Sequence, residues 1–98
     1  MQKTENDSRL IELTLLSPDS EPLTVLCDSV HLPLRDDLKG HGGGDYGIRR
    51  GHTPSVLSLG QGPLTAITNG AAVLEKRCSG GFAKVQPDRV TVISEHIS

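Results

Sequence analysis

The apolar residues of this chain fall into short runs in which they alternate with polar ones. Such alternation is typical of β-strands, because successive side chains along a strand point to opposite faces of its sheet. No stretch keeps a helical period over about ten residues, so we expect helices of a turn or two at most. The runs predict strands over 10–17, 23–27, 29–34, 82–86 and 89–94, with further short strands between 46 and 77.

Turn-forming residues separate these runs. Pro18-Asp19 ends the first run, Asn69-Gly70 lies between two others, and Pro87-Asp88 joins the last two. Asn-Gly between apolar runs is a strong hairpin signal, since a type I′ turn needs positive φ at both central positions. About ten short strands spaced by about 8–12 residues predict an all-β fold, a two-sheet antiparallel sandwich or flattened barrel.

The composition indicates how this sandwich is filled. The chain has 98 residues, the size of one domain, and its only aromatic residues are Tyr46 and Phe82, so we expect an aliphatic core. The predicted organisation is a polar, frayed segment over 1–9, the sandwich over 10–94 and a tail over 95–98. The inward positions predicted for the second and third runs are Val25, Cys27, Val30 and Leu32.

Charge and hydropathy exclude several classes of protein. The net charge is −2, whereas a nucleic-acid binder usually carries a basic stripe with stacking aromatic residues. The polar N-terminus lacks the apolar stretch of a signal peptide, and no apolar run reaches the roughly 18 residues of a membrane span. We therefore expect a cytoplasmic protein that does not insert into a membrane, with Cys27 and Cys78 as buried thiols rather than a disulfide.

The stretch "RDDLKGHGGGDY" is rich in glycine and alternating charge, so we expect a mobile surface loop over 34–44. It resembles a phosphate-binding loop only in its glycines. A P-loop also needs a Lys-Ser or Lys-Thr pair leading into a helix, and neither follows here. The sequence therefore predicts no nucleotide or other cofactor at this loop.

Two kinds of enzyme chemistry receive little support. His31, His41 and His52 could form a metal site with Asp36, Asp37 and Asp45, but no two histidines have a chelating spacing. His31 fits a strand-face residue with a satisfied hydrogen bond. Ser55 and Ser58 follow His52 but form no nucleophile elbow. We expect neither a bound metal nor catalysis.

Arg49-Arg50 is the most suggestive charged pair. The two residues adjoin a Gly-His-Thr-Pro turn, directly after the glycine-rich stretch. Exposed guanidinium groups suit carboxylate or backbone-carbonyl partners, although a solvated turn explains the pair equally well.

Taken together, the motifs in "VHLP…GDYGIRRGHTPSVLSLGQGPLTAI…CSGGFAKVQPDRVTVIS" resemble a known family. They are similar to those of the N-terminal β-sandwich domain of the epsilon subunit of F-type ATP synthase, which is called delta in mitochondria. The matching positions lie at 30–33, 45–48, 51–54 and 79–93, and the likeness extends over about 10–94. Each motif is weak alone, but their order and spacing are specific.

The resemblance implies two five-stranded antiparallel sheets and a place in the central rotor stalk. There the domain would join the gamma subunit to the membrane ring of c subunits and couple ion-driven rotation to ATP synthesis or hydrolysis, without catalysis of its own. The isolated chain would be a monomer without nucleotide affinity. In the complex it would lie peripherally, at the inner face of the bacterial plasma membrane.

Motif positions also imply contact residues. The family's gamma-facing surface falls on Ser17, His52 and Leu57. The acidic residue that faces the polar loops of the c ring falls on Asp45, and Tyr46 is the aromatic residue beside it. Arg49 and Arg50 flank the same edge and could pair with carboxylates there.

Four departures from the family pattern bear on these expectations. The segment between Pro33 and Asp45 is longer than usual, and Arg49-Arg50 replaces an apolar residue and a proline. The charged stretch over 75–77 occupies a strand that is commonly more apolar, which suggests an edge or a loosely covered face. The sequence also stops at Ser98, without the C-terminal helical hairpin that restrains ATP hydrolysis in bacterial relatives. Either the subunit is naturally short, and would then couple rotation without inhibiting, or the sequence ends at the domain boundary of a longer protein.

Two rival functions remain open at this point. One is a stand-alone β-sandwich module outside the ATP synthase that uses the glycine-rich loop to bind another protein. The other is a small metal-dependent enzyme, which would need an ion held at His41 or His52.

Overall fold

The structure is a computed structural model that describes residues 10–35 and 45–98. The predictions for the frayed segment 1–9 and for Asp36, Asp37 and His41 fall outside these residues, as does most of the predicted mobile loop. In the described residues no helix is present, and so none that could cross a membrane. Seven strands form the fold: β1 (Ile11–Ser17), β2 (Ser20–Cys27), β3 (Ser29–Pro33), β4 (Asp45–Arg49), β5 (Ser55–Thr68), β6 (Ala71–Gln86) and β7 (Arg89–Ile93).

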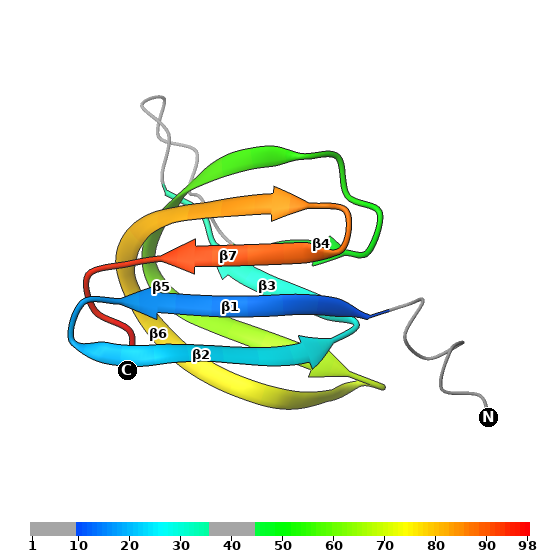
Figure 1. Ribbon diagram of the computed structural model, residues 1–98, viewed down its shortest axis with the longest axis horizontal. Coiled ribbons are helices and arrows are strands. Elements are labelled where there is room, and N and C mark those ends of the chain that lie inside the picture. Colours follow the sequence, from blue (N-terminus) through cyan, green and yellow to red (C-terminus); the bar gives the residue numbers. More distant parts are fainter. Residues whose placement is uncertain (1–9, 36–44) are drawn as a thin grey trace.

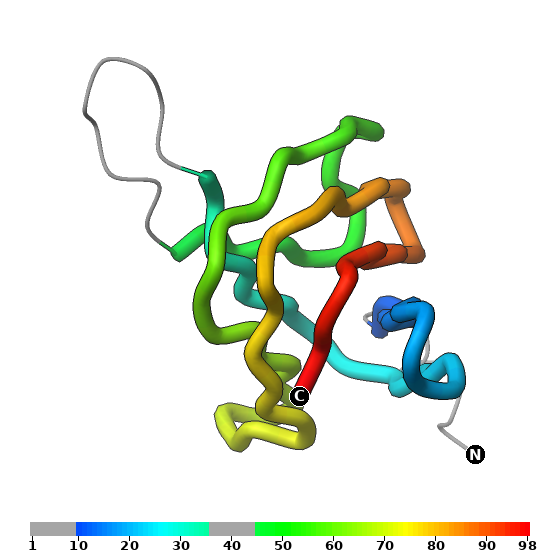
Figure 2. The backbone as a smooth tube through the Cα atoms, turned by 90° about the vertical axis from the view of Figure 1, so that its left-hand side faces the viewer, coloured from blue at the N-terminus to red at the C-terminus, as the bar shows by residue number. Residues whose placement is uncertain are grey.

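The seven strands form one sheet that folds over itself into two layers (Figures 1 and 2). Their order is β2-β1-β7-β6-β5-β3-β4. One layer contains β2, β1 and β7 with the second half of β6 and the first half of β5. The other contains β4 and β3 with the second half of β5 and the first half of β6. The predicted sandwich is therefore confirmed.

The strand count differs from the expected ten because β5 and β6 are long and strongly bent. The Gly60-Gln61-Gly62 stretch, which reads as a break in the sequence, lies inside β5. Gly80 and Gly81 bend β6 opposite it, with φ of 114° and 120°. A Cβ at Gly81 would overlap the carbonyl oxygen of Ile93, so only glycine lets the strands pass this closely.

One strand pair departs from the expected antiparallel arrangement. β1 and β7 run parallel, in a register from Glu12 opposite Arg89 to Leu16 opposite Ile93. All the other pairs are antiparallel. β1 and β7 lie at opposite ends of the sequence, so no hairpin turn between them dictates their relative direction.

The predicted turns are confirmed. Asn69 and Gly70 have φ of 54° and 79°, which are the positive values of a type I′ turn, and join β5 to β6. Pro18-Asp19 connects β1 to β2, and Pro87-Asp88 connects β6 to β7.

The space between the layers is filled by aliphatic side chains, as the composition indicates. Of the predicted inward residues, Cys27, Val30 and Leu32 are fully buried, and Val25 packs partly against them. Cys27 and Cys78 are buried free thiols, as expected. Burial, with a smaller contribution from the nearby Asp28 carboxylate, raises the pKa of the Cys27 thiol to about 11.

The tail over 95–98 is paired with β6 rather than loose. Arg77 and Ser98 exchange two backbone hydrogen bonds of 2.9 Å, and the amide of Ser79 donates to the carbonyl oxygen of His96. On its other side the tail meets the β1–β2 turn, where the His96 Nδ1 lies 3.2 Å from the Asp19 carboxylate. Before Arg77, the first half of β6 has a described strand partner on one side only, β5. The predicted edge is therefore found at Glu75 and Lys76, whereas Arg77 is paired on both sides.

Candidate functional site

Most of the predicted contact residues lie on β4 and the turn that follows it. β4 is the last strand of the sheet and pairs with β3 alone among the described strands. Because side chains alternate along it, Tyr46 and Ile48 point toward the core, whereas Asp45 and Arg49 are exposed. This strand therefore presents charged side chains to solvent on one face and packs against the core with the other.

Tyr46 and His52 hold the turn against the strand. The Tyr46 hydroxyl lies 2.9 Å from the His52 Nε2, and the two rings meet edge to face with centroids 5.8 Å apart. The His52 Nδ1 lies 2.8 Å from the carbonyl oxygen of Thr53, which can only accept. The neutral imidazole therefore carries its proton on Nδ1, and Tyr46 donates to Nε2.

His31 and Asp45 form a second pair, on the outer face. The His31 Nδ1 lies 2.8 Å from an Asp45 carboxylate oxygen. His31 is opposite Gly47 in the β3–β4 register, and a Cβ on that glycine would come within 3.4 Å of the imidazole. The prediction that His31 is a strand-face residue with a satisfied hydrogen bond is confirmed. The partner of His31 was not predicted, because the register across the long intervening segment cannot be read from the pattern.

Arg49 and Arg50 are exposed at the start of the turn. The Arg50 Nη1 donates to the carbonyl oxygen of Leu10 over 3.2 Å. The amide of Gly51 donates to Pro87 O over 2.7 Å. These bonds fix the turn against the start of β1 and the β6–β7 turn, which lie at the same end of the molecule (Figure 1).

An open pocket of about 380 Å³ lies over this end of β3 and β4. Its lining combines strand residues with short or buried side chains, two arginines and two histidines. Ser29, His31, Gly47, Ile48, Arg49, Arg50, Gly51 and His52 line it.

The two remaining predicted contact residues lie elsewhere. Ser17 ends β1 at the opposite end of the molecule from the arginines (Figure 1). Its hydroxyl lies 2.7 Å from the Asp19 carboxylate and 3.1 Å from the carbonyl oxygen of Glu95, so it supports the tail. Leu57 is half-buried on β5 and packs against the core. The structure thus brings together five of the seven residues and separates Ser17 from them.

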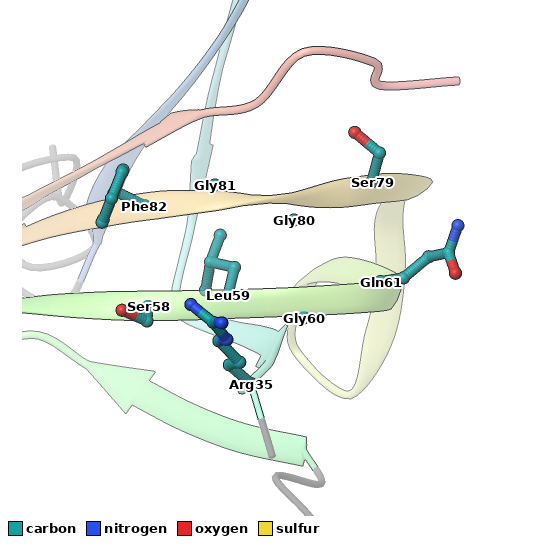
Figure 3. A pocket seen from close by; sticks show the side chains of 9 residues that line it. All are labelled: Arg35, Ser58, Leu59, Gly60, Gln61, Ser79, Gly80, Gly81 and Phe82. Atoms are coloured by element: carbon teal, nitrogen blue, oxygen red, sulfur yellow. The ribbon is translucent and has the colours of Figure 1, made fainter. Parts of the chain in front are cut away.

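A second pocket, of about 360 Å³, lies at the bend of β5 and β6 (Figure 3). Gly60, Gly80 and Gly81 leave the space, and the Arg35 side chain lies beside Ser58 and Leu59. Arg35 is the only charged residue among the described residues that line it, and none of the predicted contact residues does so.

Over residues 10–35 and 45–98, no three His, Cys, Asp or Glu side chains are placed to hold a metal ion. His31 and Asp45 pair with each other, and His52 is bonded to Tyr46 and Thr53. The acids and the histidine of 36–44 lie outside this comparison.

The sequence model of the family described as "ATP synthase, Delta/Epsilon chain, beta-sandwich domain" matches residues 10–98. The chain belongs to this family. The expected resemblance to the epsilon subunit of F-type ATP synthase is therefore confirmed, and the chain carries the epsilon-type N-terminal β-sandwich domain.

Two curated relatives are both named ATP synthase epsilon chain. That of Rhodobacter capsulatus is 34% identical over 85 residues, which cover 87% of this chain and 58% of the relative. That of Granulibacter bethesdensis is 29% identical over 83 residues, which cover 85% of this chain and 56% of the relative. The epsilon-type chain thus spans little more than half the length of these relatives.

Two solved structures share the fold. One is the Euglena gracilis mitochondrial ATP synthase, OSCP/F1/c-ring; the match has a TM-score of 0.70 and 24% identity, and covers 92% of this chain and 53% of that chain. The other is the central stalk and c-ring of the Tetrahymena thermophila mitochondrial ATP synthase, with a TM-score of 0.65, 15% identity, and 90% and 65% coverage. At these identities the similarity shows the epsilon-type fold.

Proposed function

We propose that this epsilon-type domain is a non-catalytic part of the central stalk of a rotary F-type ATP synthase. It joins the gamma subunit to the c ring, so that ion-driven rotation is coupled to ATP synthesis or hydrolysis. The observation that carries this proposal is the family match over residues 10–98, which includes the whole described sandwich. The central-stalk and c-ring content of the matched solved structures supports the same assignment.

The mechanism is mechanical. A subunit that transmits rotation must resist shear between the surfaces that meet its two neighbours. The continuous strands β5 and β6, which belong to both layers, suit that task. The core is aliphatic and closely packed, and such interiors have low compressibility.

The β4 end, that is β4 with the turn over 50–54, supplies most of the contacts in this proposal. Asp45 faces the polar loops of the c ring, with Tyr46, Arg49 and Arg50 beside it, while His52 and Leu57 face gamma. Ser17, at the far end of β1, is a further gamma contact. Outside the assembly the chain is a monomer, and within it the domain lies at the inner face of the plasma membrane.

Binding to the cognate gamma subunit and c ring tests the proposal. Wild-type chain should be retained by both. His52→Ala should weaken binding to gamma about tenfold, because it removes a half-buried side chain from the contact. Asp45→Lys should spare gamma and weaken c-ring binding, because it reverses the charge at that surface.

Thr91→Ala is a suitable control, since Thr91 lies on β7, away from the β4 end. Circular dichroism should show that all variants keep the fold. Failure of the wild-type chain to bind gamma or the c ring would contradict the proposed function. Equal retention of all variants would contradict only the named contacts.

A further inference from the structure

The pocket at the Arg49 end of β4 has the features of an anion site. Arg49 and Arg50 contribute two exposed guanidinium groups to it. Among the described residues, no carboxylate lies within ion-pair distance of either group. Two neighbouring cations without a described counter-ion, in a chain with a net charge of −2, give this surface a local charge opposite to that of the whole protein.

One of the two cations, Arg50, is also partly fixed in place. The Arg50 Nη1 is bound to Leu10 O, which orients the guanidinium and leaves its other N–H groups available. His31 lines the same pocket, and its bond to Asp45 fixes the imidazole. A pre-positioned donor loses less conformational entropy when a ligand binds.

The remaining donors favour a carboxylate over a phosphate. Phosphate sites commonly use a concave series of free backbone N–H groups. Here the amide of Gly51 is bound to Pro87 O, and that of His52 to Arg49 O. The donors that remain are mainly guanidinium N–H groups, whose planar fork matches the two oxygens of a carboxylate. The nearby Asp45 carboxylate also repels a phosphate dianion more strongly than a single negative charge.

We infer that this pocket receives the carboxylate of one Asp or Glu side chain from a protein partner. The pocket is open and lies on the last strand of the sheet, where a loop of a neighbouring subunit has access. The inference rests on the proposed function for the presence of that neighbour, and adds the chemistry of the group that it must contribute. An ion pair at such a rim sets the orientation and the rate of association more than the final affinity.

Nuclear magnetic resonance of the 98-residue chain tests the pocket without any partner. The probes are the blocked peptide Gly-Glu-Gly, its Gly-Gln-Gly counterpart and inorganic phosphate, at equal ionic strength. We expect the Nε–H signals of Arg49 and Arg50 to shift with the Glu peptide alone, and those of Arg77 and Arg89 to stay in place. Equal shifts at all arginines, equal effects of the two peptides, or a larger effect of phosphate would overturn the inference.

Association with a gamma–c-ring assembly lacking this subunit is the second test. The double variant R49Q/R50Q should associate about tenfold more slowly than wild type, with a weaker dependence on salt. R49K/R50K should regain the rate through its charge but dissociate faster, because the fork is lost. Lys84→Gln, an exposed cation on β6, is the matched control and should behave as wild type.

The two experiments separate this inference from the proposed function. If wild type associates and R49Q/R50Q does so equally fast, the pocket is not a carboxylate site, and the proposed function stands. If wild type does not associate, the proposed function fails, and the peptide titration still decides whether the pocket binds a carboxylate.

Discussion

At the scale of single residues, hydrogen-bonded pairs shape the β4 end. His52 accepts a hydrogen bond from the Tyr46 hydroxyl and donates one to Thr53 O, so both its ring nitrogens are used inside the domain. A predicted contact histidine therefore also has a structural role, because it fastens the turn to the strand. The exposed face of the imidazole remains available to a partner, since the residue is only half-buried.

Tyr46→Phe removes the donor to His52 and keeps the ring contact. We expect a loss of about 1 kcal/mol in the free energy of unfolding, the usual value of one net hydrogen bond. Urea denaturation measures it. Ser58→Ala, an exposed change on β5, is the control and should alter stability by less than about 0.5 kcal/mol. A Tyr46→Phe variant as stable as wild type would show that the hydroxyl does not stabilise the turn.

At the scale of elements, the two glycine-dependent bends decide how β5 and β6 enter both layers. Gly81 has a positive φ and no room for a side chain, because the Ile93 carbonyl lies against it. Gly51 also has a positive φ, of 90°, but a Cβ there would meet nothing within 4 Å. A side chain at Gly51 would therefore cause backbone strain alone, whereas one at Gly81 would add a steric overlap.

Gly51→Ala should cost about 1–2 kcal/mol, the price of a positive φ for a residue with a Cβ. Gly81→Ala should cost several kcal/mol more or prevent folding, since the β6 and β7 backbones must also move apart. Thermal denaturation of both variants makes the comparison. Similar melting temperatures would show that β6 can shift to accommodate a methyl group at the bend.

The elements also show what the sequence could and could not predict. Alternation and turn residues predicted the Asn69-Gly70 and Pro87-Asp88 hairpins, because these signals are local. The bends read as chain breaks, since glycines interrupt the apolar pattern in the same way in a turn and in a bent strand. The parallel β1–β7 pair and the contact of His31 with Asp45 depend on long-range register, which no local pattern specifies.

At the scale of the whole molecule, the C-terminal tail joins the two layers. It pairs with β6 through Arg77 and Ser79, and it meets the β1–β2 turn through His96 and Asp19. The hydrogen bond from Ser17 and the neighbouring His96 hold the pKa of Asp19 below its ordinary value of 3.8, although partial desolvation opposes them. The folded state therefore favours the ionised form of Asp19.

Because the pKa of Asp19 is lower in the folded state than in the unfolded state, Asp19 stabilises the folded protein at pH values above 3.8. This contribution is lost as the pH falls below 3.8 and through the pKa of the folded state. Asp19→Asn should therefore show a smaller fall in stability between about pH 4 and pH 2 than wild type. Urea denaturation across this range measures it. Asp88→Asn, in the β6–β7 turn, is the matched control, and an unchanged pH profile for Asp19→Asn would show that the carboxylate does not support the tail.

Because β5 and β6 belong to both layers, they affect how the domain responds to mechanical force. Two separate stacked sheets can slide past each other where their side chains interdigitate poorly, but here each layer continues into the other through the unbroken backbone of β5 and β6. A twist applied at the β4 end thus passes through the backbone hydrogen bonds of β3 to β5, and along the β5 backbone to the opposite layer. Under force the domain should therefore unfold cooperatively in a single step, without one layer unfolding before the other.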